Sequence, residues 1–465
     1  MSDSKTQRLR DPVHGLIVFR EDVPIDQLAW RLIDTPEFQR LRRIKQLGVS
    51  EFTFPGATHT RFAHSIGVFH NARSLVQIIE REMKRQGKDY DRGRADVAVI
   101  AALLHDLGHG PFSHTFEGVQ KSRGVKKRHE KWTAEIISNL NGCLRPLLEN
   151  FVNDRDFCAE VSGLLEAEDP EDIYHAVVSS SFDADRLDYL RRDRLMTGTG
   201  AGAIDFDWLM DNVRVADVAI GAPDMFEDDL VTSVATFCLD PKALPAAEQF
   251  LLARYTLHQQ VYFHKTTRCV EAMIAKLLRA VAYAATLPDE MEGRTGLDRH
   301  HALLSFFGYE GETIENYLAL DDTLIFGSLG RMSKAGDPAI AELAKRLQDR
   351  DLYKTLDIQF VGHDPGAQRH AARRIDKNFE QEIEKEFVIR DDSAAVSIYT
   401  QIGGDDDKTH KKLHILDGGK PVEISSLSGV VRALEAKSQF IRYYFENDSD
   451  RDLAKKGKGP ANAGA

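Results

Sequence analysis

The chain has 465 residues, which is enough for one large helical domain with accessory lobes or for two to three domains. It is acidic, with 73 Asp and Glu residues against 61 Lys and Arg residues, which argues against bulk attraction to nucleic acid but leaves a local basic cleft open. Four scattered cysteines, a polar start and no apolar run of membrane-spanning length predict a cytoplasmic protein with no disulfide framework, signal peptide or membrane partner.

The first ninety residues carry signals for one strand and several helices. Residues 8–20 predict a turn that leads into a short strand, and residues 27–34 show helical periodicity. The segment 34–37 has N-cap and N1-proline signals for a basic helix from Pro36 to about Leu47. A longer helix is expected to follow and to end near Arg85.

The rest of the chain is predicted to be mostly helical, with a change of character in its last third. Helical patterns occupy residues 95–107, 129–140, a segment capped at 169–172, and the tracts 243–285 and 300–350, with a small strand pair within 206–239. After residue 350, strands at 356–361 and 394–402 flank a charged helix at 368–387, and residues 410–419 are typical of a hairpin at a sheet edge.

These patterns predict a mostly α fold with a smaller α+β lobe near the C-terminus. The expected division is an N-terminal strand and helix segment at 1–50, a helical core at 51–345, the α+β lobe at 346–448 and a disordered tail at 449–465. The N-terminal segment is a candidate for an oligomer or regulatory interface.

One stretch concentrates side chains that are costly to bury. The helix at 95–107 is apolar almost all round, which indicates a helix inside a core, and a Gly and Pro run at 108–111 stops it. The segment 105–114, where this helix is expected to end, contains His105, Asp106, His109 and His114. Imidazoles and a carboxylate in such a place are expected to be paired or to bind a metal ion.

A metal site is the best use of the adjacent His105 and Asp106. Together with His64 and Asp185 they supply two imidazoles and two carboxylates, a set suited to Mn, Fe, Zn or Ni rather than Ca. Such an ion lowers the pKa of bound water and neutralises charge on a phosphoryl group. Spacing alone does not assign His64 or Asp185, because a lone His or Asp is more often structural.

Four motifs narrow the choice of family. They are DPVHG at 11–15, DTPEFQRLRRIKQLG at 34–48, FPGATHTRFAHSIG at 54–67 and HDLGHGPFSH at 105–114. These segments resemble the HD-domain deoxynucleoside triphosphate triphosphohydrolases, and His64, His105, Asp106 and Asp185 resemble the H…HD…D signature of HD-domain phosphohydrolases. The resemblance spans roughly residues 8–280 and implies an HD-domain helical core.

The resemblance implies a role for each matching residue. The metal would be held by His64, His105, Asp106 and Asp185. Arg61 would contact the triphosphate; His109, and His129 beside Glu130, would bind phosphate or activate water; and His114 would lie against the α-phosphate. Gln46 and Leu47 would lie near the 3′-hydroxyl, and Tyr189 would pack on the sugar. The remaining pocket positions are Asp185, Arg186, Asp193, Arg254, His258, Tyr262 and Lys265. His14, His59 and His70 are expected to be structural.

The implied reaction is hydrolysis of a dNTP, with dGTP as one candidate, to a deoxynucleoside and inorganic triphosphate, with Mn, Fe, Mg, Zn or Ni as the cofactor. Asp34, Gln39 and Arg42 match a guanine-nucleotide activator site, which implies a GTP or dNTP activator and a homo-oligomer, either dimer or tetramer. Two alternatives stay open: an HD-domain phosphodiesterase or nuclease on single-stranded nucleic acid or another nucleotide, and a non-catalytic nucleotide-sensing oligomer.

Overall fold

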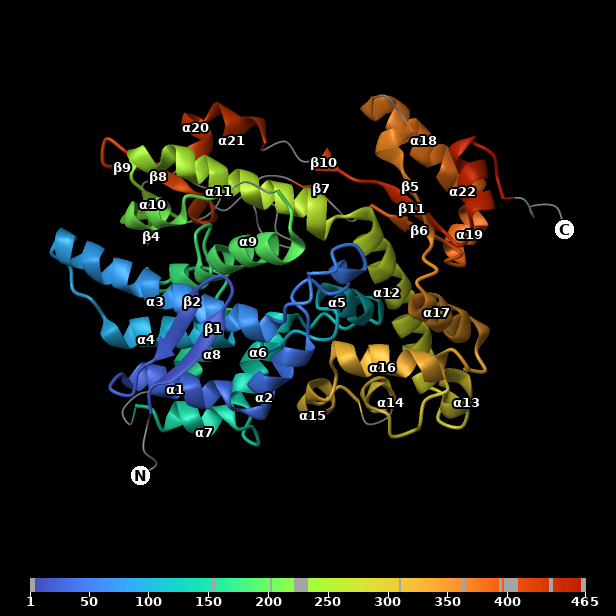
Figure 1. Cartoon of the computed structure of the whole chain (residues 1–465), viewed down its shortest axis with the longest axis horizontal. Coiled ribbons are helices and arrows are strands. Elements are labelled where there is room, and N and C mark those ends of the chain that lie inside the picture. Colours follow the sequence, from blue (N-terminus) through green and yellow to red (C-terminus); the bar gives the residue numbers. More distant parts are fainter. Residues whose placement is uncertain are drawn as a thin grey trace.

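The structure is a computed structural model. It describes residues 5–152, 156–200, 203–220, 233–308, 311–361, 364–392, 395–396, 409–434 and 438–460. Helices dominate these residues, and their strands form four small sheets (Figure 1). The predicted mostly α fold class is confirmed. None of the described helices is both long and apolar enough to cross a membrane.

The chain begins with an antiparallel hairpin, β1 (Gln7–Asp11) and β2 (Gly15–Phe19), and continues into α1 (Pro24–Ile33). The helix predicted from Pro36 to about Leu47 is wrong in length, because α2 spans Pro36–Gln39 and a 3₁₀ turn covers Arg40–Arg43. Arg40 explains the tighter winding: its buried guanidinium donates from Nε to the Leu320 carbonyl at 2.9 Å.

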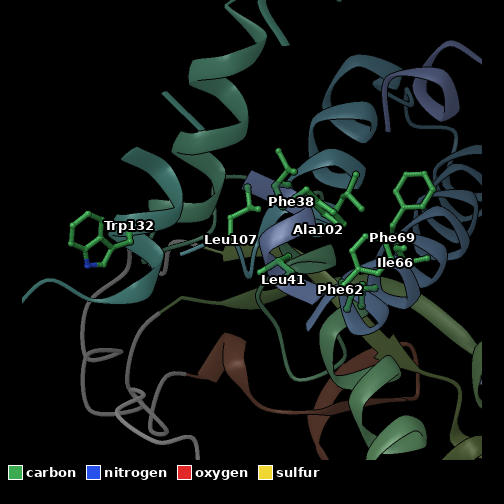
Figure 2. Packing of buried hydrophobic residues seen from close by; sticks show 14 of the residues in the cluster. Phe38, Leu41, Phe62, Ile66, Phe69, Ala102, Leu107 and Trp132 are labelled. Atoms are coloured by element: carbon green, nitrogen blue, oxygen red, sulfur yellow. The ribbon is translucent and has the colours of Figure 1, made fainter. Parts of the chain in front are cut away.

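Seven helices form the core that carries the candidate site: α3 (Arg61–Gln86), α4 (Arg92–Leu104), α5 (His114–Ser122), α6 (His129–Ser138), α7 (Leu144–Glu149), α8 (Phe157–Glu166) and α9 (Ala184–Thr197). Helix α4 is buried from residue 97 to its end, as its apolar sequence predicts. It packs against α3, which also packs against α9. Figure 2 shows part of the large buried cluster: Phe38, Leu41, Phe62, Ile66, Phe69, Ala102 and Leu107 gather around these helices, and Trp132, a member of the same cluster, lies apart from them.

The helix predicted after the cap at 169–172 does not form. Turns and a 3₁₀ turn at His175–Val177 stand there instead. Asp172 accounts for the difference, because one carboxylate oxygen accepts the backbone N–H groups of Tyr174 and His175 and the other accepts Arg94 Nε at 2.7 Å. These local bonds compete with the helical pattern.

The second half of the large core contains α10 (Phe206–Asp211), β3 (Val213–Ala219), β4 (Ser233–Leu239), α11 (Leu244–Leu257), α12 (Lys265–Ala285), α13 (Met291–Thr295), α14 (Ala302–Phe307), α15 (Ile314–Leu318), α16 (Asp322–Met332) and α17 (Pro338–Asp349). The strand pair predicted within 206–239 is confirmed as antiparallel β3 and β4. The long tract from 243 to 285 is helical but not continuous, because a π-helical turn at His258–Tyr262 separates α11 from α12.

The C-terminal elements are β5 (Lys354–Asp357), α18 (Pro365–Asn378), α19 (Glu380–Glu384), β6 (Val388–Asp391), β7 (Ala395–Val396), β8 (His414–Asp417), β9 (Lys420–Glu423), α20 (Ile424–Leu427), α21 (Gly429–Ala433), β10 (Ser438–Gln439), β11 (Arg442–Phe445) and α22 (Asp448–Lys455). The sheet β5-β11-β6 has its own apolar cluster with α18. The predicted hairpin forms as β8–β9. It belongs to the sheet β3-β4-β8-β9 and not to β5-β11-β6, because β8 pairs in parallel with β4.

Two C-terminal predictions change or go untested. Residues 394 and 397–402 of the predicted strand at 394–402 lie outside the described residues, and so do residues 461–465 of the predicted disordered tail. The tail prediction is wrong at its start, because α22 begins at Asp448. Asn447 caps that helix by accepting the Asp450 N–H at 2.8 Å, and Ala454 is buried in the small cluster.

Candidate active site

Three helix ends bring the four predicted metal ligands together. His64 lies in the first turn of α3, Asp185 lies in the first turn of α9, and His105 and Asp106 follow directly after the last residue of α4. His64 Nε2 lies 2.9 Å from Asp185 Oδ1 and 3.8 Å from Asp106 Oδ2. His105 Nε2 lies 3.3 Å from Asp106 Oδ1 and 3.9 Å from Asp185 Oδ1. Ligand atoms of His64, His105 and Asp106 therefore lie within 4.8 Å of one another, and Asp185 lies beside the two imidazoles.

The orientation of both imidazoles fits a metal ion. His64 Nδ1 donates to Asp188 Oδ2 at 2.8 Å, and His105 Nδ1 donates to the Ala102 carbonyl at 2.8 Å. Among the described residues, Nε2 of His64 and Nε2 of His105 are buried and make no well-aligned hydrogen bond, although His64 Nε2 lies close to Asp185 Oδ1. Because Nδ1 of each ring is already engaged, Nε2 is the nitrogen that is turned toward the carboxylates, which is how metal-bound histidines are oriented.

The electrostatics of the cluster favour a cation. Burial lowers the pKa of His64, but Asp185 and Asp188 outweigh this effect and raise it to about 10. Burial raises the pKa of Asp106, whereas Arg61 and His105 bring it well below its usual range. The carboxylates therefore remain charged, and their negative charge is the field that a divalent ion would neutralise.

Arg61, for which the family resemblance implies a triphosphate contact, lies at the edge of this cluster. Its NH1 donates to Asp106 Oδ2 at 2.6 Å, and its Nε and NH2 donate to Ser113 Oγ at 3.0 and 2.8 Å. Ser113 and Phe112 have φ values of 51° and 53°, in the left-handed region. This strained turn positions Ser113 under the guanidinium and starts α5 at His114.

A second group of histidines lies beside the first. The His109 ring stacks on the His129 ring with centroids 3.9 Å apart, and His109 Nε2 lies 3.2 Å from Asp106 Oδ1. Burial is the main cause of the lowered pKa of His109, followed by Arg61 and His129. His109 is therefore a neutral ring between the two groups.

Glu117 organises the second group and was not among the predicted site residues. Its Oε1 accepts His129 Nδ1 at 2.7 Å, and its Oε2 lies 3.2 Å from His114 Nδ1. Burial raises the pKa of Glu117, but these two imidazoles lower it strongly. The predicted neighbour Glu130 lies farther away, with Oε2 3.6 Å from His129 Nδ1, and bonds to Arg128. The signal for Glu117 was its position three residues after His114 on a helix.

Most predicted pocket residues lie on α9 and at the junction of α11 and α12. Tyr262 OH donates to Asp193 Oδ2 at 2.7 Å, and the Tyr189 and Tyr262 rings lie edge to face at 6.3 Å. The His258 ring packs edge-on to Tyr262 at 4.8 Å, and burial, with Arg254, lowers the pKa of His258 to about 3. This group forms one aromatic wall with a neutral imidazole.

Other pocket residues are placed without such joint contacts. Arg186 is buried and bonded to Asp183. Gln46 has a buried Oε1 with no partner among the described residues, and Leu47 follows it at an intermediate burial. Lys265 is exposed at the first position of α12.

The predicted regulatory residues lie together on the N-terminal segment. Gln39 Nε2 donates to the Ile33 carbonyl at 2.8 Å, Arg42 Nε donates to Gln39 Oε1 at 2.7 Å, and the Arg42 guanidinium lies 3.5 Å from the Phe62 ring centroid. Asp34 is exposed at the end of α1. A nucleotide-binding role for these residues stays a prediction.

Comparison with known proteins assigns the family. The HD domain family model matches residues 61–192, and that of the HD associated region matches residues 228–292. An uncharacterized protein of Bacillus subtilis, YwfO, is 31% identical over 441 residues, which cover 93% of this chain and 90% of the relative. A phosphohydrolase structure from Bacteroides thetaiotaomicron, 23% identical, has the same fold, with a TM-score of 0.71 over 95% of this chain and 100% of the other.

A relative with a named activity matches a smaller share of its own length. The deoxynucleoside triphosphate triphosphohydrolase SAMHD1 of Gallus gallus is 30% identical over 373 residues, which cover 74% of this chain and 55% of the relative. The chain thus spans about half the length of that enzyme. With the HD-domain match and the ligand geometry around His64 and His105, these likenesses show that the chain belongs to the HD-domain phosphohydrolases that include the SAMHD1 triphosphohydrolases.

Proposed function

We propose that the protein is a metal-dependent triphosphohydrolase that cleaves dNTPs to a deoxynucleoside and inorganic triphosphate. The observation that carries the proposal is the arrangement around Asp106. Its Oδ1 faces His105 and His109 at 3.3 and 3.2 Å, and its Oδ2 accepts Arg61 at 2.6 Å. A metal cluster and a phosphate-binding guanidinium therefore share one carboxylate, which supports a triphosphate as the ligand.

The metal would be held by His64, His105, Asp106 and Asp185. A divalent ion bound there supplies a Lewis acid for the phosphoryl oxygen and lowers the pKa of a bound water. The donor set suits Mn, Fe, Zn, Ni or Mg, and the identity of the ion is part of the proposal.

The chain's own residues would handle phosphate charge and protons. Arg61 is already oriented by Ser113 and would turn its fork to phosphate oxygens. His114 and His129 direct Nδ1 to Glu117, so each ring keeps Nε2 for water or for the substrate. Water attacks the α-phosphorus, the bond to the 5′-oxygen breaks, and the leaving oxygen takes a proton; His114 and His129 are the groups that would carry that proton.

The aromatic wall would bind the nucleoside. The Tyr189 and Tyr262 rings pack edge to face with centroids 6.3 Å apart, and Asp193 accepts a hydrogen bond from the Tyr262 hydroxyl. Tyr189 would pack on the sugar and exclude a 2′-hydroxyl, with Gln46 and Leu47 near the 3′-hydroxyl. Preference for dGTP, activation by GTP or a dNTP at Asp34, Gln39 and Arg42, and assembly as a dimer or tetramer are further parts of the proposal.

Product analysis tests this function. The purified full chain would be incubated with each dNTP, singly and mixed, with Mn²⁺ or Mg²⁺ and with or without GTP, and the products would be separated by ion-pair chromatography. A deoxynucleoside and inorganic triphosphate are expected, and stimulation by mixing or by GTP is expected if the activator site operates. Intact dNTPs together with cleavage of single-stranded DNA or another phosphate ester would overturn the substrate and leave the metal chemistry in place.

A further inference from the structure

The tip of the N-terminal hairpin reaches the inner side of the metal cluster. Residues 12–14 join β1 to β2, and His14 at this tip is 174 residues away from Asp188 in the sequence. His14 Nε2 donates to Asp188 Oδ1 at 2.6 Å, while the other oxygen, Oδ2, accepts His64 Nδ1 at 2.8 Å. One buried carboxylate therefore joins the hairpin to a predicted metal ligand.

A closed ring of hydrogen bonds fixes this carboxylate. Arg192 donates from Nε and NH2 to the two oxygens of Asp188 at 2.7 and 2.9 Å, and from NH1 to Asp11 Oδ2 at 2.8 Å. The other oxygen of Asp11 accepts the backbone N–H of His14 at 3.0 Å. Asp11, His14, Asp188 and Arg192 thus hold one another, and the side chains of His14 and Asp188 are 2% and 0% exposed.

The hairpin is also seated by apolar packing next to the same helix. Phe19 is fully buried and stacks on Phe69 of α3 with centroids 5.3 Å apart. Arg73, also on α3, donates to the Val18 carbonyl at 2.9 Å. Figure 1 shows the hairpin beside α3, the helix that carries His64. The tip therefore has a defined position relative to the ligand.

We propose that His14 is a positioning residue of the metal centre. Its Nε2–H and the Arg192 fork hold Asp188 in the one place where Oδ2 accepts His64 Nδ1, and this bond directs the Nε2 lone pair of His64 at the ion. Partners behind a metal ligand commonly change metal affinity by about 10- to 100-fold. This inference rests on the metal site of the proposed function and assigns the hairpin a part in it.

Metal binding by the full chain tests the role of His14. After removal of bound metal, Mn²⁺ would be titrated without nucleotide, with free Mn²⁺ followed by electron paramagnetic resonance. His14→Ala is expected to weaken Mn²⁺ binding by about 10-fold. His14→Gln is expected to restore most of it, because the Gln amide also places a donor at the position of Nε2. The visible spectrum of the Co²⁺-loaded protein should shift in His14→Ala only.

His70→Ala is the matched control. His70 is a neighbouring histidine whose ring lies 5.0 Å from that of His14, and Asp188 bonds instead to His14, His64 and Arg192. This variant should bind Mn²⁺ like the unaltered chain. Equal affinity of His14→Ala and the unaltered chain, or equal loss in His14→Ala and His14→Gln, would overturn the proposal.

A second variant keeps the test decisive if His14→Ala does not fold. Asp11→Asn weakens the hold on Arg192 while leaving the hairpin sequence otherwise unchanged, and it is expected to weaken Mn²⁺ binding in the same direction. Unchanged Mn²⁺ affinity in Asp11→Asn would overturn the role of this ring of hydrogen bonds in positioning Asp188 and His64. Because no dNTP is present, failure of the proposed reaction does not affect this readout.

Discussion

Two neighbouring clusters of the molecule are built from the same residue types but place their carboxylates differently. In the metal cluster, His64 and His105 engage Nδ1 with Asp188 and a carbonyl, and their Nε2 atoms face one point. In the second cluster, one carboxylate, Glu117, receives Nδ1 of both His114 and His129. Both sets bring possible ligand atoms within 4.8 Å of one another.

The difference shows that connectivity, rather than composition, separates a metal site from a proton-handling site. In the metal cluster Asp106 and Asp185 lie on the Nε2 side of the imidazoles, where the proposed function places them as ligands. In the second cluster the carboxylate lies behind the rings and orients them. Substitutions in the two clusters are therefore expected to affect metal content and turnover in different ways.

The largest effect is expected where the metal cluster is broken. His105→Ala combined with Asp106→Ala removes two of four ligands, so metal content should fall to background. A bound ion stabilises the transition state by several kcal/mol, so hydrolysis should drop by at least about 10³-fold. Metal analysis, turnover and far-ultraviolet circular dichroism check this. A helical protein that retains its metal and its turnover would contradict the assignment.

A smaller and more selective effect is expected in the second cluster. Glu117→Gln removes the charge that orients His114 and His129, so kcat should fall by about 10²-fold while metal content stays unchanged. Glu130→Gln is the matched control, because Glu130 bonds to Arg128 and should change kcat much less. Equal losses in the two variants, or loss of metal in Glu117→Gln, would remove the distinction between the clusters.

Sequence alone predicted the metal cluster only in part. The apolar helix and the Gly and Pro stop identified His105 and Asp106, because a buried helix end with polar side chains is a local feature. His64 and Asp185 lie 41 residues before and 79 residues after this pair in the printed numbering and came from the family resemblance. Local patterns carry no information on which distant helix ends meet.

The supporting residues could not be predicted for a related reason. The spacing of Glu117 from His114 is a local signal, but its contact with His129 depends on the turn at Phe112 and Ser113 that starts α5. His14 was expected to be structural, and its contact with Asp188 spans 174 residues. The same limit applies to the fold. The predicted helix from Pro36 ends early where Arg40 bonds to a carbonyl 280 residues away, and β8 pairs with β4 instead of with a strand of the small C-terminal lobe.

The smallest effect is expected at Gly67, where an added methyl group would press on Asp188, the residue behind His64. It is measured as a change in the free energy of unfolding and in Mn²⁺ affinity. A Cβ at Gly67 would lie 1.9 Å from Asp188 Oδ1 and 2.6 Å from Arg192 NH2. Gly67→Ala should therefore lower the free energy of unfolding by about 1–3 kcal/mol, as overpacking of a core does. It should also weaken Mn²⁺ binding, because Asp188 must move away from His64.

Gly163→Ala is the control that separates crowding from the general effect of alanine in a helix. Gly163 lies inside α8, and a Cβ there would meet no atom within 4 Å in the described structure. The free energy of unfolding of this variant should rise by about 0.5–1 kcal/mol, because Gly destabilises a helix interior by that amount relative to Ala. Thermal unfolding of the two variants should thus shift in opposite directions. A stabilised Gly67→Ala protein with normal Mn²⁺ affinity would mean that Asp188 does not depend on this close approach to hold His64.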